Sequence, residues 1–140
     1  MRDGQGMTVD LVEVGIPRMD EDHQFVVGLV EDVVTLLIDN PRHDLVTTKL
    51  KELASHSEDH FQWEEEQMQQ YGFPAYMVHK QEHQCVLQEF NDSLILWEST
   101  KDAEALGDYL SGPFCRWLEN HVATMDWVTA DFLRRATRSG

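Results

Sequence analysis

Four long segments of the chain carry apolar residues at three- and four-residue steps and show no strand-like alternation. They cover about residues 20–39, 44–71, 75–97 and 103–135. Apolar residues with this spacing lie along one face of an α-helix. Four such helices joined by short loops bury those faces against one another. The sequence therefore predicts an all-α fold, an up-down-up-down four-helix bundle.

Proline or glycine marks most of the breaks around these segments, which lie at Pro17, Asn40-Pro41, Gly72-Phe73-Pro74 and, less distinctly, 99–102. These residues end regular structure because they restrict the backbone or free it. We therefore expect residues 1–17 to form an N-terminal arm and residues 18–138 to form one bundle domain. Asp20 is a candidate cap for the first helix, because its side chain can accept hydrogen bonds from free backbone amides.

Charge and composition exclude several classes of partner. A chain of 140 residues is long enough for one domain with its own core. Its 26 acidic and 11 basic residues give a net charge of −15, which repels phosphate backbones and anionic lipid. We expect binding neither to nucleic acid nor to membranes, since no apolar run approaches the roughly 20 residues of a membrane span.

The cysteines and the start of the chain bear on the compartment. Cys85 and Cys115 lack the spacing of a redox or metal motif. We expect both to be small buried apolar side chains in a reducing environment. The first ten residues contain no apolar run behind a basic head, so no signal peptide is expected. Together these features favour a cytoplasmic protein.

Histidines and carboxylates recur at helical spacings along all four segments. The set, in chain order, is His23, His60, Glu64, His79, His83, His121 and Asp126. Two of its pairs are four residues apart, which places each pair on one helix face. Five imidazoles and two carboxylates exceed the four ligands of one zinc ion and suit two first-row metal ions with bridging carboxylates. The pattern predicts a dimetal centre in the core of the bundle.

Two features of the fourth segment depart from a regular helix. His121 and Asp126 are five residues apart, which is about 140° of rotation, so Met125 would share the face of His121 instead. Either the dimetal centre is wide enough for side chains from both helix faces to reach it, or the helix contains a π-bulge that brings them to one face. Gly112-Pro113 implies either a kink or a short helix before the main one.

Other polar residues near the set have alternative interpretations. His56 lies four residues before His60; it is an ordinary satisfied histidine, a partner of a ligand or an alternative ligand. His43 follows a proline near a helix start and is expected at the surface. Of the run 64–66, only Glu64 has the spacing of a ligand, and we expect the other two glutamates to form a solvated face.

Several motifs, taken together, resemble the hemerythrin family in its bacterial single-domain form. The similarity extends from about Leu11 to Phe132. The matching text is Val14-Gly15-Ile16-Pro17-Arg18-Met19-Asp20-Glu21-Asp22-His23, His60-Phe61-Gln62-Trp63-Glu64-Glu65, Met68, Tyr71-Gly72-Phe73-Pro74, His79-xxx-His83 and Trp117-Leu118-xx-His121-xxxx-Asp126. All seven ligand positions of the family pattern are filled.

The resemblance implies a non-heme di-iron centre, oxo- or hydroxo-bridged, that binds dioxygen reversibly. By this similarity the two carboxylates bridge the two iron ions, three histidines complete one iron, and two serve the other and leave one position open. The bridging carboxylates are Glu64 and Asp126. The first iron has His79, His83 and His121, and the iron with the open position has His23 and His60.

Apolar residues next to these positions should form a dry ligand pocket. The candidates lie beside a ligand in sequence or one helical turn away, and they are Val26, Phe61, Trp117, Leu118 and Val122.

Four functions fit this set of residues. The leading hypothesis is an oxygen carrier, store or delivery protein that is not an enzyme. A second is an oxygen or redox sensor that signals to a protein partner, and residues 134–140 are then either a plain tail or the start of a linker. A third is a peroxidase or nitric oxide scavenger that uses the same site. A fourth is a zinc or manganese bundle without a redox role.

Overall fold

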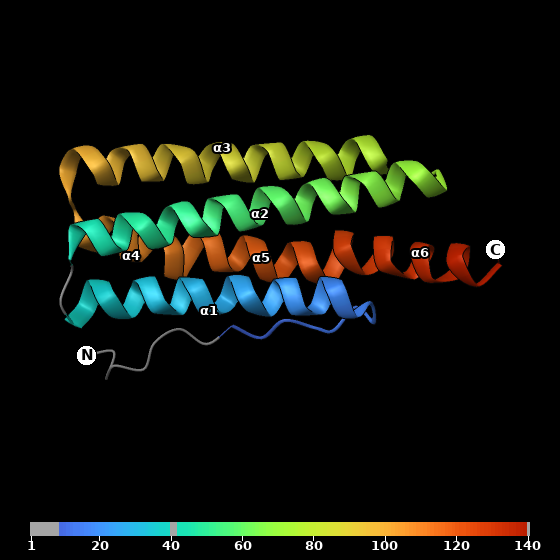
Figure 1. Ribbon diagram of the computed structural model, residues 1–140, viewed down its shortest axis with the longest axis horizontal. Helices are drawn as coiled ribbons and strands as arrows, with labels where there is room; N and C mark the ends of the chain where they lie inside the picture. The colour runs from blue at the N-terminus through green and yellow to red at the C-terminus, as the bar shows by residue number, and fades with distance from the viewer. Residues whose placement is uncertain (1–8, 40–41, 140) are drawn as a thin grey trace.

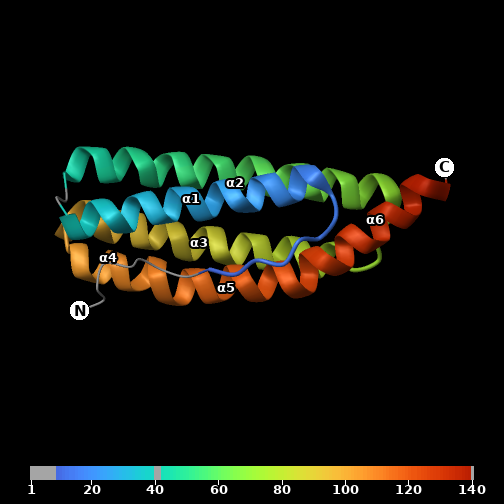
Figure 2. The same cartoon turned by 90° about the horizontal axis from the view of Figure 1, so that it is seen from below.

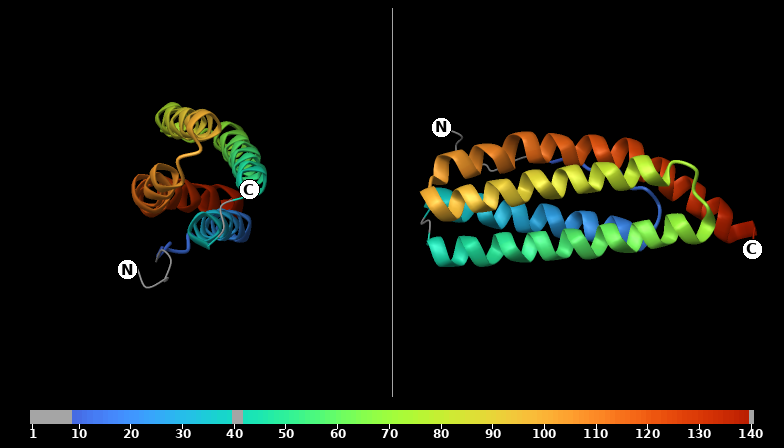
Figure 3. Two further views of the ribbon diagram at one scale, coloured as in Figure 1. Left: turned by 90° about the vertical axis from the view of Figure 1, so that its left-hand side faces the viewer. Right: turned by 90° about the horizontal axis from the view of Figure 1, so that it is seen from above.

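Four antiparallel helical rods form the molecule in the computed structural model, which describes residues 9–39 and 42–139 (Figure 1). The first three rods are α1 (Pro17–Asp39), α2 (His43–Tyr71) and α3 (Tyr76–Thr100). The fourth rod has five consecutive parts, which are α4 (Ala103–Tyr109), η1 (Leu110–Phe114), α5 (Cys115–His121), η2 (Val122–Asp126) and α6 (Trp127–Ser139). Seen along its length, the bundle places the four rods around one axis (Figure 3). The predicted all-α bundle is confirmed.

The first helix begins at Pro17, three residues before the start expected from the apolar pattern. Proline suits a first helical position, because its missing N–H would have no partner there. The Asp20 carboxylate accepts hydrogen bonds from the amides of Val14 at 2.8 Å and Gly15 at 3.1 Å. Asp20 therefore lies in the first turn of α1 and does not cap its free amides as expected; instead, it holds the end of the N-terminal arm against α1.

The predicted breaks after α2 and α3 coincide with left-handed backbone. Gly72 has φ 70°, and the Phe73 amide donates to the Met68 carbonyl at 2.8 Å, which closes the end of α2. Lys101, at φ 55°, ends α3, and the Asp102 carboxylate accepts from the Ala105 amide at 3.0 Å to start α4. The predicted break at Asn40-Pro41 lies outside the described residues, between the end of α1 and the start of α2.

The apolar faces meet along the bundle axis. Trp97 is the largest fully buried side chain, and its Nε1 donates to Thr47 Oγ1 at 3.0 Å. Cys115 is buried as expected, but Cys85 is exposed, because it lies on the outer side of α3. The expectation of a second buried cysteine was wrong. Among the residues described, no helix is long and apolar enough to cross a bilayer.

The fourth rod contains two π-turns. The sequence left open a kink or a separate short helix at Gly112-Pro113, but the structure continues the helix through the π-turn η1. A π-turn holds one residue more than an α-turn, which relieves the clash between the proline ring and the carbonyl four residues before it. The second π-turn, η2, precedes α6, and α6 leaves the direction of α5 there (Figure 2).

The arm provides a stability prediction at Gly15, whose φ is 89°. The Arg134 guanidinium donates to the Val14 carbonyl, and a Cβ on Gly15 would lie 2.8 Å from Arg134 Nη1. We expect Gly15→Ala to lower the free energy of unfolding by about 1–3 kcal/mol in urea titrations. The control is Gly28→Ala inside α1, where a Cβ meets nothing within 4 Å and should stabilise by about 1 kcal/mol. If Gly15→Ala and Gly28→Ala both raised or both lowered the free energy of unfolding, the contact between the arm and Arg134 would not contribute to stability as proposed.

Candidate metal centre

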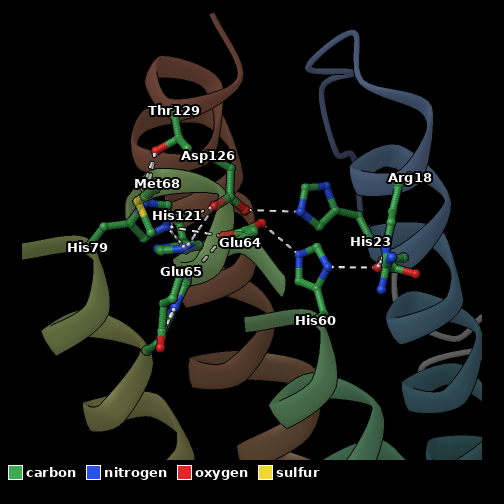
Figure 4. Close-up of polar contacts among 12 residues, drawn as sticks. Arg18, His23, His60, Glu64, Glu65, Met68, His79, His121, Asp126 and Thr129 are labelled. Atoms are coloured by element: carbon green, nitrogen blue, oxygen red, sulfur yellow. Dashed lines mark hydrogen bonds and ion pairs between the residues drawn. The ribbon is translucent and has the colours of Figure 1, made fainter. Parts of the chain in front are cut away.

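The seven residues of the predicted ligand set come together in the core, from all four rods (Figure 4). His23 lies on α1, and α2 and α3 supply a pair each. His121 is the last residue of α5 and Asp126 the last residue of η2. All seven side chains are buried, and Glu64 has no exposed surface at all. Buried polar groups of this number need partners, since transfer from water without compensation is costly.

Their ligand atoms form two overlapping groups. Within each group, one nitrogen or oxygen of every residue lies within 4.8 Å of the others. One group is Glu64, His79, His83, His121 and Asp126, and the other is His23, His60, Glu64 and Asp126. The two groups share both carboxylates and no imidazole. The family resemblance implied the same two groupings from the sequence, and their assignment to two ions stays a prediction.

Short contacts without hydrogen bonds indicate that the site is built for cations. His60 Nε2 is 2.7 Å from Glu64 Oε2, and His23 Nε2 is 2.9 Å from Asp126 Oδ2. Yet both of these nitrogens, His83 Nε2 and both Glu64 oxygens have no hydrogen-bond partner within the described part of the chain. The atoms therefore point towards common centres and not along hydrogen bonds to one another. Bound cations would satisfy all of them at once.

Two imidazoles meet nitrogen to nitrogen in the larger group. His79 Nε2 and His121 Nε2 are 3.1 Å apart. Two ligands about 2.1 Å from one ion, at right angles to each other, are about 3.0 Å apart. The contact therefore fits two nitrogens that would hold one ion, and the donor set fits the metals that bind imidazole and carboxylate together.

Four of the five histidines are oriented by a partner at Nδ1. The pairs are His60 with Asp22 at 2.8 Å, His83 with Glu65 at 3.0 Å, His121 with Glu82 at 2.5 Å and His79 with Thr129 Oγ1 at 2.8 Å. A proton held at Nδ1 leaves the Nε2 lone pair directed at the centre. His23 Nδ1 has no such partner among the residues described.

The orienting carboxylates follow a rule that the sequence analysis missed. Each is the sequence neighbour of a ligand on its own helix, but each binds the histidine of another helix. Glu65 was expected on a solvated face, and that was wrong, because its carboxylate reaches His83. Asp22 and Glu82 were not singled out at all. An acidic residue directly beside a ligand was the available signal.

The π-turn η2 resolves the unusual spacing of five residues. Asp126 is buried and its Oδ1 lies 3.1 Å from His121 Nε2, whereas Met125 is only half-buried. Because the π-turn holds an additional residue, Asp126 returns to the face of His121. The π-bulge, one of the two alternatives left open by the sequence, is therefore present.

The two remaining histidines lie outside both groups. His56 Nε2 is 3.4 Å from the Asp22 carbonyl oxygen, and its ring packs on Phe25 at 4.4 Å. It therefore contacts the residue that orients His60, and it is not within reach of the ligand atoms. His43 is exposed, as expected, and its ring meets the edge of Trp97.

The charges of the cluster compensate one another without a metal. Burial by itself lowers the pKa of His60, but the charge of Glu64 and the hydrogen bond of Asp22 raise it to about 10. Burial likewise disfavours a charged His121, while Asp126 and Glu82 raise its pKa to about 9. Burial works to raise the pKa of Asp126, yet hydrogen bonding and charge from His121 hold it well below its usual range.

This compensation predicts that the stability of the metal-free chain falls with rising pH, whereas that of the metal-loaded chain does not. Histidines whose pKa is raised on folding from 6.5 stabilise the fold below pH 6.5, and that stabilisation is lost as the pH rises through about 9 to 10. The metal-free chain should therefore lose stability between pH 6.5 and 10. Metal binds neutral imidazole, so loading at pH 7 should release about two protons and remove this loss.

Urea unfolding at pH 7 and pH 10, with and without metal, checks this prediction. Proton release is measured by titration calorimetry in buffers of different ionisation enthalpy. An identical loss of stability in both forms, or loading without proton release, would contradict the proposed protonation of His60 and His121.

A small apolar cavity adjoins the smaller ligand group. Its volume is about 30 Å³, enough for a water-sized or diatomic molecule. Four of the predicted pocket residues line it, namely Val26, Phe61, Trp117 and Leu118. The fifth, Val122, is fully buried but is not among the residues that line this cavity. Val86, Phe90 and Phe114 also line it. Val86 lies one helical turn after His83 and was overlooked, whereas sequence proximity to the ligands gave no signal for Phe90 or Phe114.

Two aromatic rings cover ligand imidazoles. Phe61 stacks on His83 with ring centroids 3.8 Å apart, and Trp117 stacks on His121 at 4.4 Å. Both rings thus line the cavity and fix the orientation of a ligand. Such contacts separate the imidazoles from solvent and keep the centre dry.

Fold and centre together define a class: four-helix-bundle proteins with a histidine- and carboxylate-rich cation site in the core. The model of the family described as hemerythrin, hemerythrin HHE cation binding domain, matches residues 14–130. The chain belongs to this family, in its bacterial form, which confirms the resemblance noted in the sequence.

Several bacterial proteins named bacteriohemerythrin are similar to this chain over most of both lengths. The protein of Aquifex aeolicus is 33% identical over 123 residues, which cover 86% of this chain and 92% of that protein. The protein of Pseudomonas paraeruginosa is 26% identical over 130 residues, covering 91% and 80%. That of Stenotrophomonas maltophilia is 25% identical over 122 residues, covering 87% and 77%.

Proposed function

We propose that the chain binds dioxygen reversibly at a di-iron centre and acts as an oxygen carrier, store or delivery protein, not as an enzyme. The seven buried side chains of the two ligand groups would hold the irons. Family membership and the histidine- and carboxylate-rich donor set support iron as the metal. The name bacteriohemerythrin of the similar proteins supports oxygen binding as the role.

The observation that carries this proposal is the asymmetry of the two groups. The larger group supplies three imidazoles with the two shared carboxylates, whereas the smaller supplies only two imidazoles. An ion in the smaller group is therefore poorer in protein ligands, and exogenous molecules need such an open position. Four ligand candidates line the apolar cavity: His23 and His60 of the smaller group, the shared Asp126, and His121 of the larger group. Both imidazoles of the smaller group thus border the cavity, against one of the three in the larger group, which supports an open position on that side.

The chain's own residues set the chemistry of that space. When bound, two ferrous ions would supply the two electrons that reversible dioxygen binding requires. Glu64 and Asp126, the carboxylates shared by both ligand groups, would each serve both ions. Neutral imidazoles keep the centre low in negative charge, and the apolar walls around Phe61 and Leu118 exclude bulk water.

An optical spectrum through one oxygen cycle tests the proposal. The chain is loaded anaerobically with ferrous iron, assayed for two irons per chain, exposed to air and then degassed. Colour that appears in air and bleaches on degassing is the expected result. Colour that persists after degassing would overturn the carrier role in favour of sensing or catalysis. Failure to bind two irons would overturn the di-iron assignment itself.

A further inference from the structure

The ligand cavity contains one polar side chain that belongs to neither ligand group. Ser57 lies on α2, one turn before His60, and both residues line the cavity. The remaining lining residues are either ligands or apolar side chains. Ser57 is only half-buried, whereas most of the cavity wall is buried. Ser57 therefore lies where the cavity approaches the surface.

The Ser57 hydroxyl lacks the carbonyl partner that five other hydroxyls in the described helices have. Serine and threonine side chains inside helices commonly donate to the carbonyl four residues before them. Five others in this chain do so, namely Thr48, Thr100, Ser111, Thr124 and Thr137. Within residues 9–39 and 42–139, Ser57 has no hydrogen bond of this or any other kind. Its hydroxyl is thus free to bind a molecule in the cavity.

The half-buried lining residues form the outer rim of the cavity. They are Ala54 and Ser57 from α2, Leu87 from α3 and Trp117 from α5, whereas Val86 and Phe90 lie deeper. A molecule that enters between α2 and α3 passes the one hydroxyl of the wall. Polar and apolar ligands would differ there, because only a polar ligand gains a hydrogen bond.

We propose that Ser57 determines the ligand specificity of the cavity, by offering a hydrogen bond that favours water and small anions over apolar gases. The proposal rests on the proposed function, since it concerns the cavity beside the same centre. The class of ligand favoured is a linear or bent anion of two or three atoms, for which azide is a convenient probe. Without the hydroxyl, the wall around Ser57 becomes more apolar, which favours apolar gas over polar molecules at that side of the cavity.

A matched pair of substitutions isolates the hydroxyl. Ser57→Thr keeps it, and Ser57→Val has nearly the shape of threonine without it. In the iron-loaded, oxidised chain, azide should bind Ser57→Thr about as tightly as the unaltered chain, and Ser57→Val about tenfold more weakly. Equal azide affinities in the two variants would overturn the proposal.

A second readout does not depend on iron. In the chain loaded with redox-inactive zinc, xenon NMR measures the affinity of the cavity for an apolar gas. Xenon should bind Ser57→Val several-fold more tightly than Ser57→Thr, and equal binding again overturns the role of Ser57. If the iron-loaded unaltered chain binds neither azide nor dioxygen, the proposed function fails, while the xenon comparison still decides the proposal for Ser57.

Discussion

Replacing Glu64 by glutamine is expected to abolish tight binding of both metal ions. Glu64 belongs to both ligand groups and has no exposed surface. Glutamine keeps the shape but removes the charge that offsets two cations. Because changes to groups that merely orient ligands already cost about 10–100-fold in metal affinity, loss of a shared ligand should cost each ion more than 100-fold. Iron per chain after dialysis, and the air-dependent colour, measure the effect.

The fold itself should survive Glu64→Gln, but the metal-free chain should lose stability. The charge of Glu64 supports the protonated His60 ring 2.7 Å away, and glutamine leaves that buried charge less compensated. Circular dichroism should therefore change little, whereas the unfolding temperature without metal should fall. The matched control is Glu66→Gln, an exposed residue two positions along the same helix, which should keep two irons. Full iron binding by the Glu64 variant would refute the role of Glu64 as a shared ligand.

Metal loading should raise the unfolding temperature by about 10–20 °C. A ligand that binds only the folded chain stabilises it by about 4 kcal/mol at a thousandfold excess over its dissociation constant. For a domain of this length, each kcal/mol corresponds to a few degrees. The gain arises because the metal satisfies the buried nitrogens and oxygens that otherwise lack partners.

Scanning calorimetry before and after chelation measures this gain. Two histidine variants provide the comparison. His83→Gln removes a buried ligand candidate and should lose most of the gain, whereas His43→Gln alters an exposed ring and should keep it. If chelation leaves the unfolding temperature unchanged, the buried cluster is stable by itself and the assignment of a metal centre fails.

The sequence predicted the parts of this structure that depend on local spacing. Apolar steps of three and four residues located the four rods, and the left-handed turns at Gly72 and Lys101 confirm two of the predicted breaks. Pairs such as His79 and His83, which share a helix face at any register, supplied four of the seven ligand candidates, and the family resemblance supported the full set. These features need only the geometry of one helix.

Features that depend on contacts between helices were harder to predict. Glu65 orients His83 because α2 and α3 lie side by side, and no pattern within α2 distinguishes it from the exposed Glu66. Cys85 is exposed because the rotation of α3 about its axis turns it outward. The unusual spacing of Asp126 gave a hint of the π-turn, but the folded chain was needed to choose between the two alternatives.

The π-turn η2 also decides how this stretch responds to a change in the length of the gene. Because the turn absorbs one residue, loss of one codon within residues 122–126 would leave an ordinary helix in which the aspartate follows His121 by four residues and keeps its face. Ala130 and Leu133 would then stay in the core. Loss of one codon within α6, which has no such turn, would instead rotate everything after it by about 100°. Insertion of one codon into an uninterrupted helix is therefore the simplest evolutionary origin of the five-residue spacing.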